Sequence, residues 1–243
     1  RYIDIQGMSD ASMSDGIEIT NSTFEIRNMH IPTTNANVVG NAIYATLNKN
    51  LVVRDNKFTT VFPDNMNGIS SNYYAIMLSS CKTFNVNKNE FDLSGVSAII
   101  LSDIPNGTTA KVVNNKISVR NNNVISYSPI TLYGVNLVSG TNILLAYNNV
   151  YALGTDANAI GYNLGYTGTN TSNIQVKNNI IVSELRGYAV KTTPSTPQSI
   201  AYSNNLYYKI PGDNSTYLFY YGNSTVDSPT IWQTYTNEIN SYY

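Results

Sequence analysis

One short pattern of apolar and polar positions recurs along the chain. It reads apolar, any, apolar, any, any, Asn, any, apolar, as in Leu51-x-Val53-x-x-Asn56-x-Phe58. The alternation of apolar positions with a period of two is typical of a β-strand with one buried face. Because the offset from the apolar pair to the Asn never changes, the pattern indicates one structural unit that repeats. The later copies are centred on Asn89, Asn115, Asn148, Asn179 and Asn205.

A second, shorter apolar pair precedes each copy and predicts another strand. A divergent first copy reads Phe24-x-Ile26-x-x-Met29-x-Ile31, with Met in the place of Asn. Alternation alone decides which residues of the shorter strand point inward. The pairs that we expect to point inward are Ile17/Ile19, Ile43/Ala45, Ile76/Leu78, Ile99/Leu101, Ile130/Leu132, Ile160/Tyr162, Val190/Thr192 and Phe219/Tyr221.

The spacing of the repeats predicts an all-β fold, a single-stranded right-handed parallel β-helix. Successive Asn positions differ by 33, 26, 33, 31 and 26 residues, which suits a coil of three short strands and two bends. We expect seven to eight coils over residues 16–223, after a lead-in over residues 1–15. A β-sandwich or propeller would show turns every 8–12 residues without a fixed Asn position.

The Asn residues are expected to stack at the bend between the second and third strands of each coil. There each side-chain amide can bond the next amide along the axis. Asn also tolerates the left-handed backbone that a tight bend needs. We therefore predict a structural Asn ladder of Asn56, Asn89, Asn115, Asn148, Asn179 and Asn205.

The last twenty residues, 224–243, have a different pattern and are expected to cap the helix. Ser228-Pro229-Thr230-Ile231-Trp232-Gln233 predicts a turn followed by a short helix, and it contains the only Trp. Such a segment would lie across the last coil and cover its edge.

The coil pattern resembles the PbH1-type repeat of right-handed β-helices. The stretches that carry the resemblance are Asn114-Asn115-Lys116-Ile117 and Val176-Lys177-Asn178-Asn179-Ile180. The Asn- and Tyr-rich, charge-poor composition is similar to the adhesin-like surface proteins of methanogenic archaea. This resemblance implies an extracellular, cell-surface location, and we expect the chain to be a piece of a larger protein. It implies little about activity, because β-helices host many unrelated functions.

Composition narrows the range of partners. Charged residues make up only 12% of the chain, with 14 Lys+Arg against 15 Asp+Glu. This argues against nucleic-acid binding and against electrostatic docking on a membrane. No apolar run is long enough for a membrane-spanning helix, so we expect no membrane insertion by this chain. Polarity comes instead from uncharged groups, 36 Asn above all, and 20 Tyr supply aromatic surface with a polar tip.

Candidate chemistry is sparse, and we expect no catalytic, metal or cofactor site. Stacked columns predict cross-strand ion pairs of Glu90 with Lys57 and Lys116, and of Asp55 with Lys88, rather than paired carboxylates. Cys81 is the only cysteine and His30 the only histidine. The remaining carboxylates are expected to be solvated. Two alternatives stay open: Asp64 and Asp103 on neighbouring loops could act in catalysis, and the N-terminal group could hold calcium, namely Asp4, Asp10, Asp15 and Glu18.

Three functions follow as hypotheses. The first is a non-catalytic, adhesin-like or structural stalk that displays binding loops to surface glycans or to other cell-surface proteins. The alternative is a carbohydrate-active or glycan-binding β-helix, in which Tyr133, Tyr162 and Tyr166 lie on lengthening loops and stack on sugar rings. The third is a surface-layer or sheath subunit that self-associates end to end through its open β-sheet edges.

Overall fold

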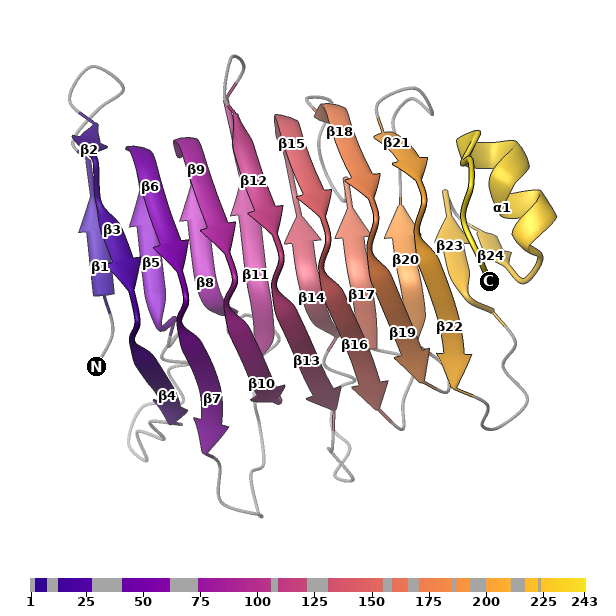
Figure 1. The fold of residues 1–243 in the computed structure, drawn as a ribbon, viewed down its shortest axis with the longest axis horizontal. Coiled ribbons are helices and arrows are strands. Elements are labelled where there is room, and N and C mark those ends of the chain that lie inside the picture. Colours follow the sequence, from indigo (N-terminus) through magenta and orange to yellow (C-terminus); the bar gives the residue numbers. More distant parts are fainter. Residues whose placement is uncertain are drawn as a thin grey trace, which may run out of the picture.

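The chain forms a parallel β-helix in which three long sheets run along one axis (Figure 1). The computed structural model describes residues 3–7, 13–27, 41–61, 74–105, 109–121, 131–154, 159–165, 171–184, 187–192, 200–210, 217–222 and 224–243. Each coil contributes one strand to each sheet, so strands that are neighbours in a sheet lie about 30 residues apart in sequence. The predicted fold class is confirmed, including the short helix near the C-terminus.

Sheet A collects the first strand of each coil and has nine strands. All neighbours in it are parallel except the last pair, β23 and β24. Its strands, in order, are β1 (Ile3–Gln6), β5 (Ile43–Thr46), β8 (Tyr74–Ser79), β11 (Ser97–Ser102), β14 (Leu132–Leu137), β17 (Ala159–Leu164), β20 (Tyr188–Thr192), β23 (Phe219–Tyr221) and β24 (Ser224–Val226).

Sheets B and C collect the second and third strands. Sheet B contains β2 (Ser14–Asp15), β6 (Asn48–Arg54), β9 (Lys82–Asn87), β12 (Ala110–Val113), β15 (Gly140–Ala146), β18 (Thr171–Lys177) and β21 (Ile200–Ser203), with β3 (Glu18–Thr20) also paired to β6. Sheet C contains β4 (Thr23–Arg27), β7 (Lys57–Val61), β10 (Glu90–Ser94), β13 (Lys116–Asn121), β16 (Asn149–Gly154), β19 (Ile180–Glu184) and β22 (Leu206–Ile210).

The interior is filled by columns of like residues, one from each coil. Leu51 and Val53 of β6 are fully buried, and the register places Phe84 and Val86 of the next coil beside them. In sheet C the rings of Phe24, Phe58 and Phe91 stack nearly parallel, with centroids 4.9 and 4.7 Å apart. Continuous apolar columns of this kind remove large side chains from water and provide most of the stability of the fold.

The register of the first coil differs from the prediction. Ile19 pairs with Val53 and Phe24 pairs with Phe58, so the first copy of the pattern is Ile17-x-Ile19-x-x-Ser22-x-Phe24. Ser22 therefore stands in the column of ladder Asn residues, and the predicted copy with Met at that place was wrong. The expected lead-in over residues 1–15 includes β1 and β2, which pair with β5 and β6 as the strands of other coils do.

Two of the predicted inward pairs were also wrong. Ile99 and Leu101 pair with Val135 and Leu137, so Val135 and Leu137 continue the inward column that had been assigned to Ile130/Leu132, although Leu132 is itself buried. In the next coil the inward pair is Tyr162/Leu164 rather than Ile160/Tyr162. Tyr133, which was expected to lie on a loop, instead belongs to β14. Ile130 lies outside the described residues, as do Met29 and Ile31.

The second bend of each coil has a left-handed residue, but that residue is not the ladder Asn. It is the residue immediately before it, with φ between 53° and 57° in Asp55, Lys88, Asn114, Tyr147, Asn178 and Asn204. The predicted link between Asn and left-handed backbone was therefore wrong at the ladder positions. Non-glycine residues adopt this conformation at a cost, and the hydrogen bonds of the ladder next to each bend help to offset that cost.

Small residues line the interior where each coil enters sheet A. A Cβ atom added to Gly161 would lie 2.5 Å from the Ala189 carbonyl oxygen and 2.6 Å from Ile181 Cγ2. A Cβ atom added to Gly134 would likewise lie 2.6 Å from the Gly161 carbonyl oxygen and 2.7 Å from Val150 Cγ1. These two coils therefore approach more closely than any side chain at either position would allow.

The C-terminal segment covers the end of the helix, as predicted. α1 (Pro229–Thr236) places Trp232 against the last coil, where the indole is fully buried. Its ring stacks on Phe219 at 4.2 Å and meets Tyr202 edge-on at 5.3 Å. No helix in the described part of the chain is long and apolar enough to cross a membrane.

Candidate functional site

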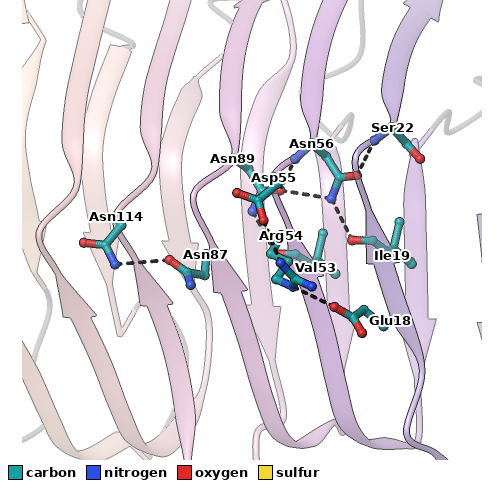
Figure 2. A network of polar contacts seen from close by, with 10 residues as sticks. All are labelled: Glu18, Ile19, Ser22, Val53, Arg54, Asp55, Asn56, Asn87, Asn89 and Asn114. Carbon is teal, nitrogen blue, oxygen red and sulfur yellow. Dashed lines mark hydrogen bonds and ion pairs between the residues drawn. The ribbon is translucent and has the colours of Figure 1, made fainter.

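The ladder of Asn side chains is the most regular polar feature of the interior. Figure 2 shows its N-terminal part, with Ser22, Asn56 and Asn89. The Oδ1 atom of Asn89 accepts from both the backbone N–H and the Nδ2 of Asn56, each at 3.1 Å. The Nδ2 of Asn89 also donates to the Val53 carbonyl at 2.8 Å. From Asn56 to Asn179 each member donates its backbone N–H and its Nδ2 to the Oδ1 of the next, and all six are at most 3% exposed.

Different residues occupy the two ends of the ladder. At the N-terminal end the Ser22 backbone N–H donates to Asn56 Oδ1 at 3.0 Å. At the C-terminal end the tail folds back, so that Ser203 pairs with Ile239 and Leu206 pairs with Tyr242. This places Ser241 in the ladder column, where its Oγ accepts from the Asn205 backbone N–H at 2.9 Å.

Glu238 completes the C-terminal end of the ladder with a buried carboxylate. Its Oε1 accepts from Asn205 Nδ2 at 2.9 Å and from the Tyr207 hydroxyl at 2.9 Å. Its Oε2 accepts from Trp232 Nε1 at 2.6 Å. Burial and the nearby Glu238 charge raise the pKa of Tyr207 well above its ordinary value, so this phenol stays a donor. The sequence did not reveal this cluster, because Glu238 reaches it only through the fold of the tail.

Tyr162 belongs to the ladder rather than to a ligand site. It is fully buried, and its hydroxyl donates to Asn179 Oδ1 at 3.0 Å and accepts from Asn148 Nδ2 at 3.1 Å. Desolvation raises its pKa. The hypothesis that Tyr162 stacks on a sugar ring was therefore wrong, because its side chain points inward. Tyr166 lies outside the described residues.

Tyr133 lies on the outer face of sheet A rather than on a loop. It precedes the inward-facing Gly134, and it is partly exposed. In register it is followed on the next two coils by Ile160 and Tyr188. A second outward row runs beside this one and is formed by Asn136, Asn163, Lys191 and Tyr220.

The amides in the second row are buried even though they point outward. Asn136 Nδ2 donates to the Tyr74 hydroxyl at 2.9 Å, and Asn163 Nδ2 donates to Asn136 Oδ1 at 2.8 Å. Asn163 is only 2% exposed, and its own Oδ1 has no hydrogen-bond partner. A buried polar atom without a partner is costly, so this oxygen marks a place where a further donor would be stabilising.

Aromatic rings surround the C-terminal end of the same face. The Tyr188 and Tyr220 rings lie 5.5 Å apart, and Lys191 Nζ lies 5.0 Å from the Tyr220 ring centroid. Burial, together with the neighbouring phenols of Tyr220 and Tyr217, raises the pKa of Tyr188. The Tyr188 hydroxyl is therefore protonated at neutral pH and can both donate and accept.

The predicted ion pairs are only partly as expected. Lys116 Nζ lies 3.0 Å from Glu90 Oε1, with Lys57 beside Glu90 in register. Asp55, however, pairs with Arg54 of its own coil at 3.0 Å rather than with Lys88, and Arg54 also bonds Glu18. All of these groups are partly or fully exposed to solvent, so each pair contributes little to stability.

The carboxylates considered for chemistry do not gather into one site. Asp103 accepts a hydrogen bond from the Ser139 hydroxyl, and Asp15 pairs with Lys49 at 3.0 Å. In the described ranges, no group of three or more His, Cys, Asp or Glu could hold a metal ion. Asp64, which was considered for catalysis, Asp10, which was considered for calcium, and His30, the only histidine, lie outside the described ranges.

Two further titratable groups have unusual surroundings. Cys81 is fully buried at the first bend, where its thiol donates to the Ala45 and Ser79 carbonyls at 3.4 Å. Burial raises its pKa to about 11. Lys209 occupies an inward column, and its ammonium donates to the Gly187 and Tyr217 carbonyls. Desolvation lowers the pKa of Lys209 to about 8.

Comparisons with known proteins do not assign the chain to a family. A scan against protein-family models finds no match, and searches of curated proteins and of solved structures find none either.

Proposed function

We propose that this chain is a rigid, non-catalytic stalk segment of an adhesin-like protein that is displayed on the outside of the cell. The observation that carries the proposal is the continuity of the polar column from Ser22 to Ser241. Each coil is held to both neighbours by a buried amide, in addition to the backbone bonds of three sheets.

Such an arrangement resists bending and local opening. The coils rise about 4.8 Å each, so seven steps span about 35 Å of continuous β-structure. Because apolar columns and ladder bonds both run along the axis, a coil cannot tilt without breaking contacts with two neighbours. A low-charge exterior rich in Asn and Tyr suits a protein that remains soluble outside the cell and contacts other surfaces through uncharged groups.

Surface labelling and gene deletion test the proposal together. We expect an antibody against this segment to label intact cells, and deletion of the parent gene to reduce attachment of cells to their usual substratum. A reintroduced gene that carries Asn148→Ala, which weakens the segment, should restore less attachment than one that carries Asn149→Ala. Labelling that appears only after lysis would refute the surface location. Release of oligosaccharides from a polysaccharide panel by the purified protein would refute the non-catalytic role.

A further inference from the structure

The outer face of sheet A at the C-terminal half of the helix combines the features of a ligand surface. Its two rows contain aromatic rings and amides from four coils, contributed by β14, β17, β20 and β23. These four strands contain no carboxylate, and Lys191 is their only charged residue. The face is therefore polar, aromatic and almost uncharged.

We propose that this face binds a neutral polysaccharide, whose sugar rings stack on Tyr188 and Tyr220 and whose hydroxyl groups bond Asn163. The site goes beyond the role of a stalk and does not depend on it. The apolar face of a hexose ring packs well against an aromatic side chain, while its hydroxyl groups need donors and acceptors at the rim. Both kinds of group are present here within three neighbouring strands.

Asn163 provides the observation that points to a ligand. Hydrogen bonds run along the row from Asn163 to Asn136 to Tyr74, and they leave Asn163 Oδ1 as an acceptor without a donor. A sugar hydroxyl supplies a donor of the right kind. Lys191 is the neighbour of Asn163 on the next coil, and its Nζ lies over the Tyr220 ring, so the amide and the aromatic ring belong to one continuous outward row.

The geometry also favours a polymer over a single sugar. Equivalent residues on neighbouring coils repeat every 4.8 Å or so, which is close to the length of one sugar unit in an extended chain. Two or three units can therefore follow the helix axis across Asn163, Lys191 and Tyr220. A nucleic acid is disfavoured, because one lysine cannot balance a row of phosphates.

Titration calorimetry with the purified chain tests the proposal, using mannan, galactan, xylan and a mixed-linkage glucan as neutral probes. Tyr188→Ala and Tyr220→Ala should each weaken binding of the recognised polymer about tenfold, as loss of a stacked ring would. Asn163→Ala should also weaken it. Tyr208→Ala is the matched control, because Tyr208 is 53% exposed on sheet C at the same end of the helix, and its affinity should stay at the wild-type level.

Thermal unfolding of each variant keeps the result interpretable, because only variants that unfold at or near the wild-type temperature are compared. An absence of saturable binding to all four polymers at millimolar sugar would overturn the proposal, while leaving the stalk function untouched. An equal loss of affinity in Tyr208→Ala would also overturn it. So would a preference for polygalacturonate that disappears at high salt, because that would indicate recognition of charge.

Discussion

Asn148 and Asn149 are consecutive residues with opposite surroundings, and their alanine variants measure what the ladder contributes. Asn148 is fully buried in the ladder, whereas Asn149 is exposed on sheet C between Lys116 and Ile180. The two substitutions remove the same side chain one residue apart. The difference between them therefore isolates burial and hydrogen bonding from any intrinsic preference of Asn or Ala.

The expected loss of unfolding free energy follows from the hydrogen bonds that Asn148→Ala removes. The Asn115 backbone N–H loses its acceptor at 3.0 Å, and the Val112 carbonyl loses its donor at 2.9 Å. Both groups remain buried, and each unsatisfied group costs about 1–3 kcal/mol. We therefore expect Asn148→Ala to lower the free energy of unfolding by about 2–5 kcal/mol, and Asn149→Ala to change it by less than about 0.5 kcal/mol.

Urea unfolding followed by circular dichroism provides the measurement. With an m value of about 3 kcal/mol/M, the midpoint of Asn148→Ala should fall by about 1 M relative to wild type, while that of Asn149→Ala should not move. If the two variants share one midpoint, the ladder is not a buried, bonded column, and the register on which the site rests is incorrect.

Four further outcomes follow from the interior. Iodoacetamide at pH 8 should label Cys81 only in urea, because burial raises the pKa of the thiol to about 11; rapid labelling of the folded protein would contradict this. Gly161→Ala should lower the thermal midpoint more than a substitution at the exposed Gly16, which has open space around it but a strained φ. Glu238→Gln should detach the tail, so that fluorescence of Trp232, the only tryptophan, changes at lower urea than the circular dichroism does; coincident transitions would show that the cap survives. Finally, burial raises the folded pKa of Tyr162 above its ordinary 10.0, so the stability that it contributes is present below pH 10 and is lost as the pH rises further; a urea midpoint that stays constant up to pH 12 would refute this.

The sequence predicted the second and third strands because a buried amide leaves little freedom in its surroundings. Each ladder Asn needs an apolar pair before it and an apolar residue after it, and this requirement placed Val53, Asn56 and Phe58 correctly. The same reasoning missed Ser22, because the first copy was placed seven residues too late, with Met29 at the Asn position. At the first coil a backbone N–H from Ser22 is sufficient for the ladder.

The first strands were harder to place because alternation alone does not fix the register. Ile130/Leu132 and Val135/Leu137 alternate equally well, and only pairing with Ile99 and Leu101 distinguishes them. A partial signal was the separation from the apolar pair to the next strand, which recurs in several coils although it is eleven residues from Ile99 to Ala110. It is eight residues from Ile43 to Leu51 and also eight from Val135 to Ile143.

The candidate surface on sheet A was only partly predictable. Tyr133 was singled out from the sequence, but as part of a loop, and the correct strand register would have placed it beside Ile160 and Tyr188. The acceptor on Asn163 that lacks a donor has no sequence signal, because it depends on how the side-chain amides of Asn136 and Asn163 are oriented toward each other. End-to-end self-association stays a prediction, which light scattering at increasing protein concentration can test.

The repeated bond from one ladder Asn to the next makes an inner coil an exchangeable unit. Asn89 and Asn115 are 26 residues apart, yet each follows a residue with left-handed backbone, Lys88 or Asn114, and each is followed two positions later by a buried apolar residue, Phe91 or Ile117. Removal of residues 90–115 would join Asn89 to Lys116 and leave a shorter helix in which Asn89 meets Asn148. Gene segments that encode one coil could therefore be gained or lost during evolution without a change at either end, so that the length of the rod varies while its terminal coils stay the same.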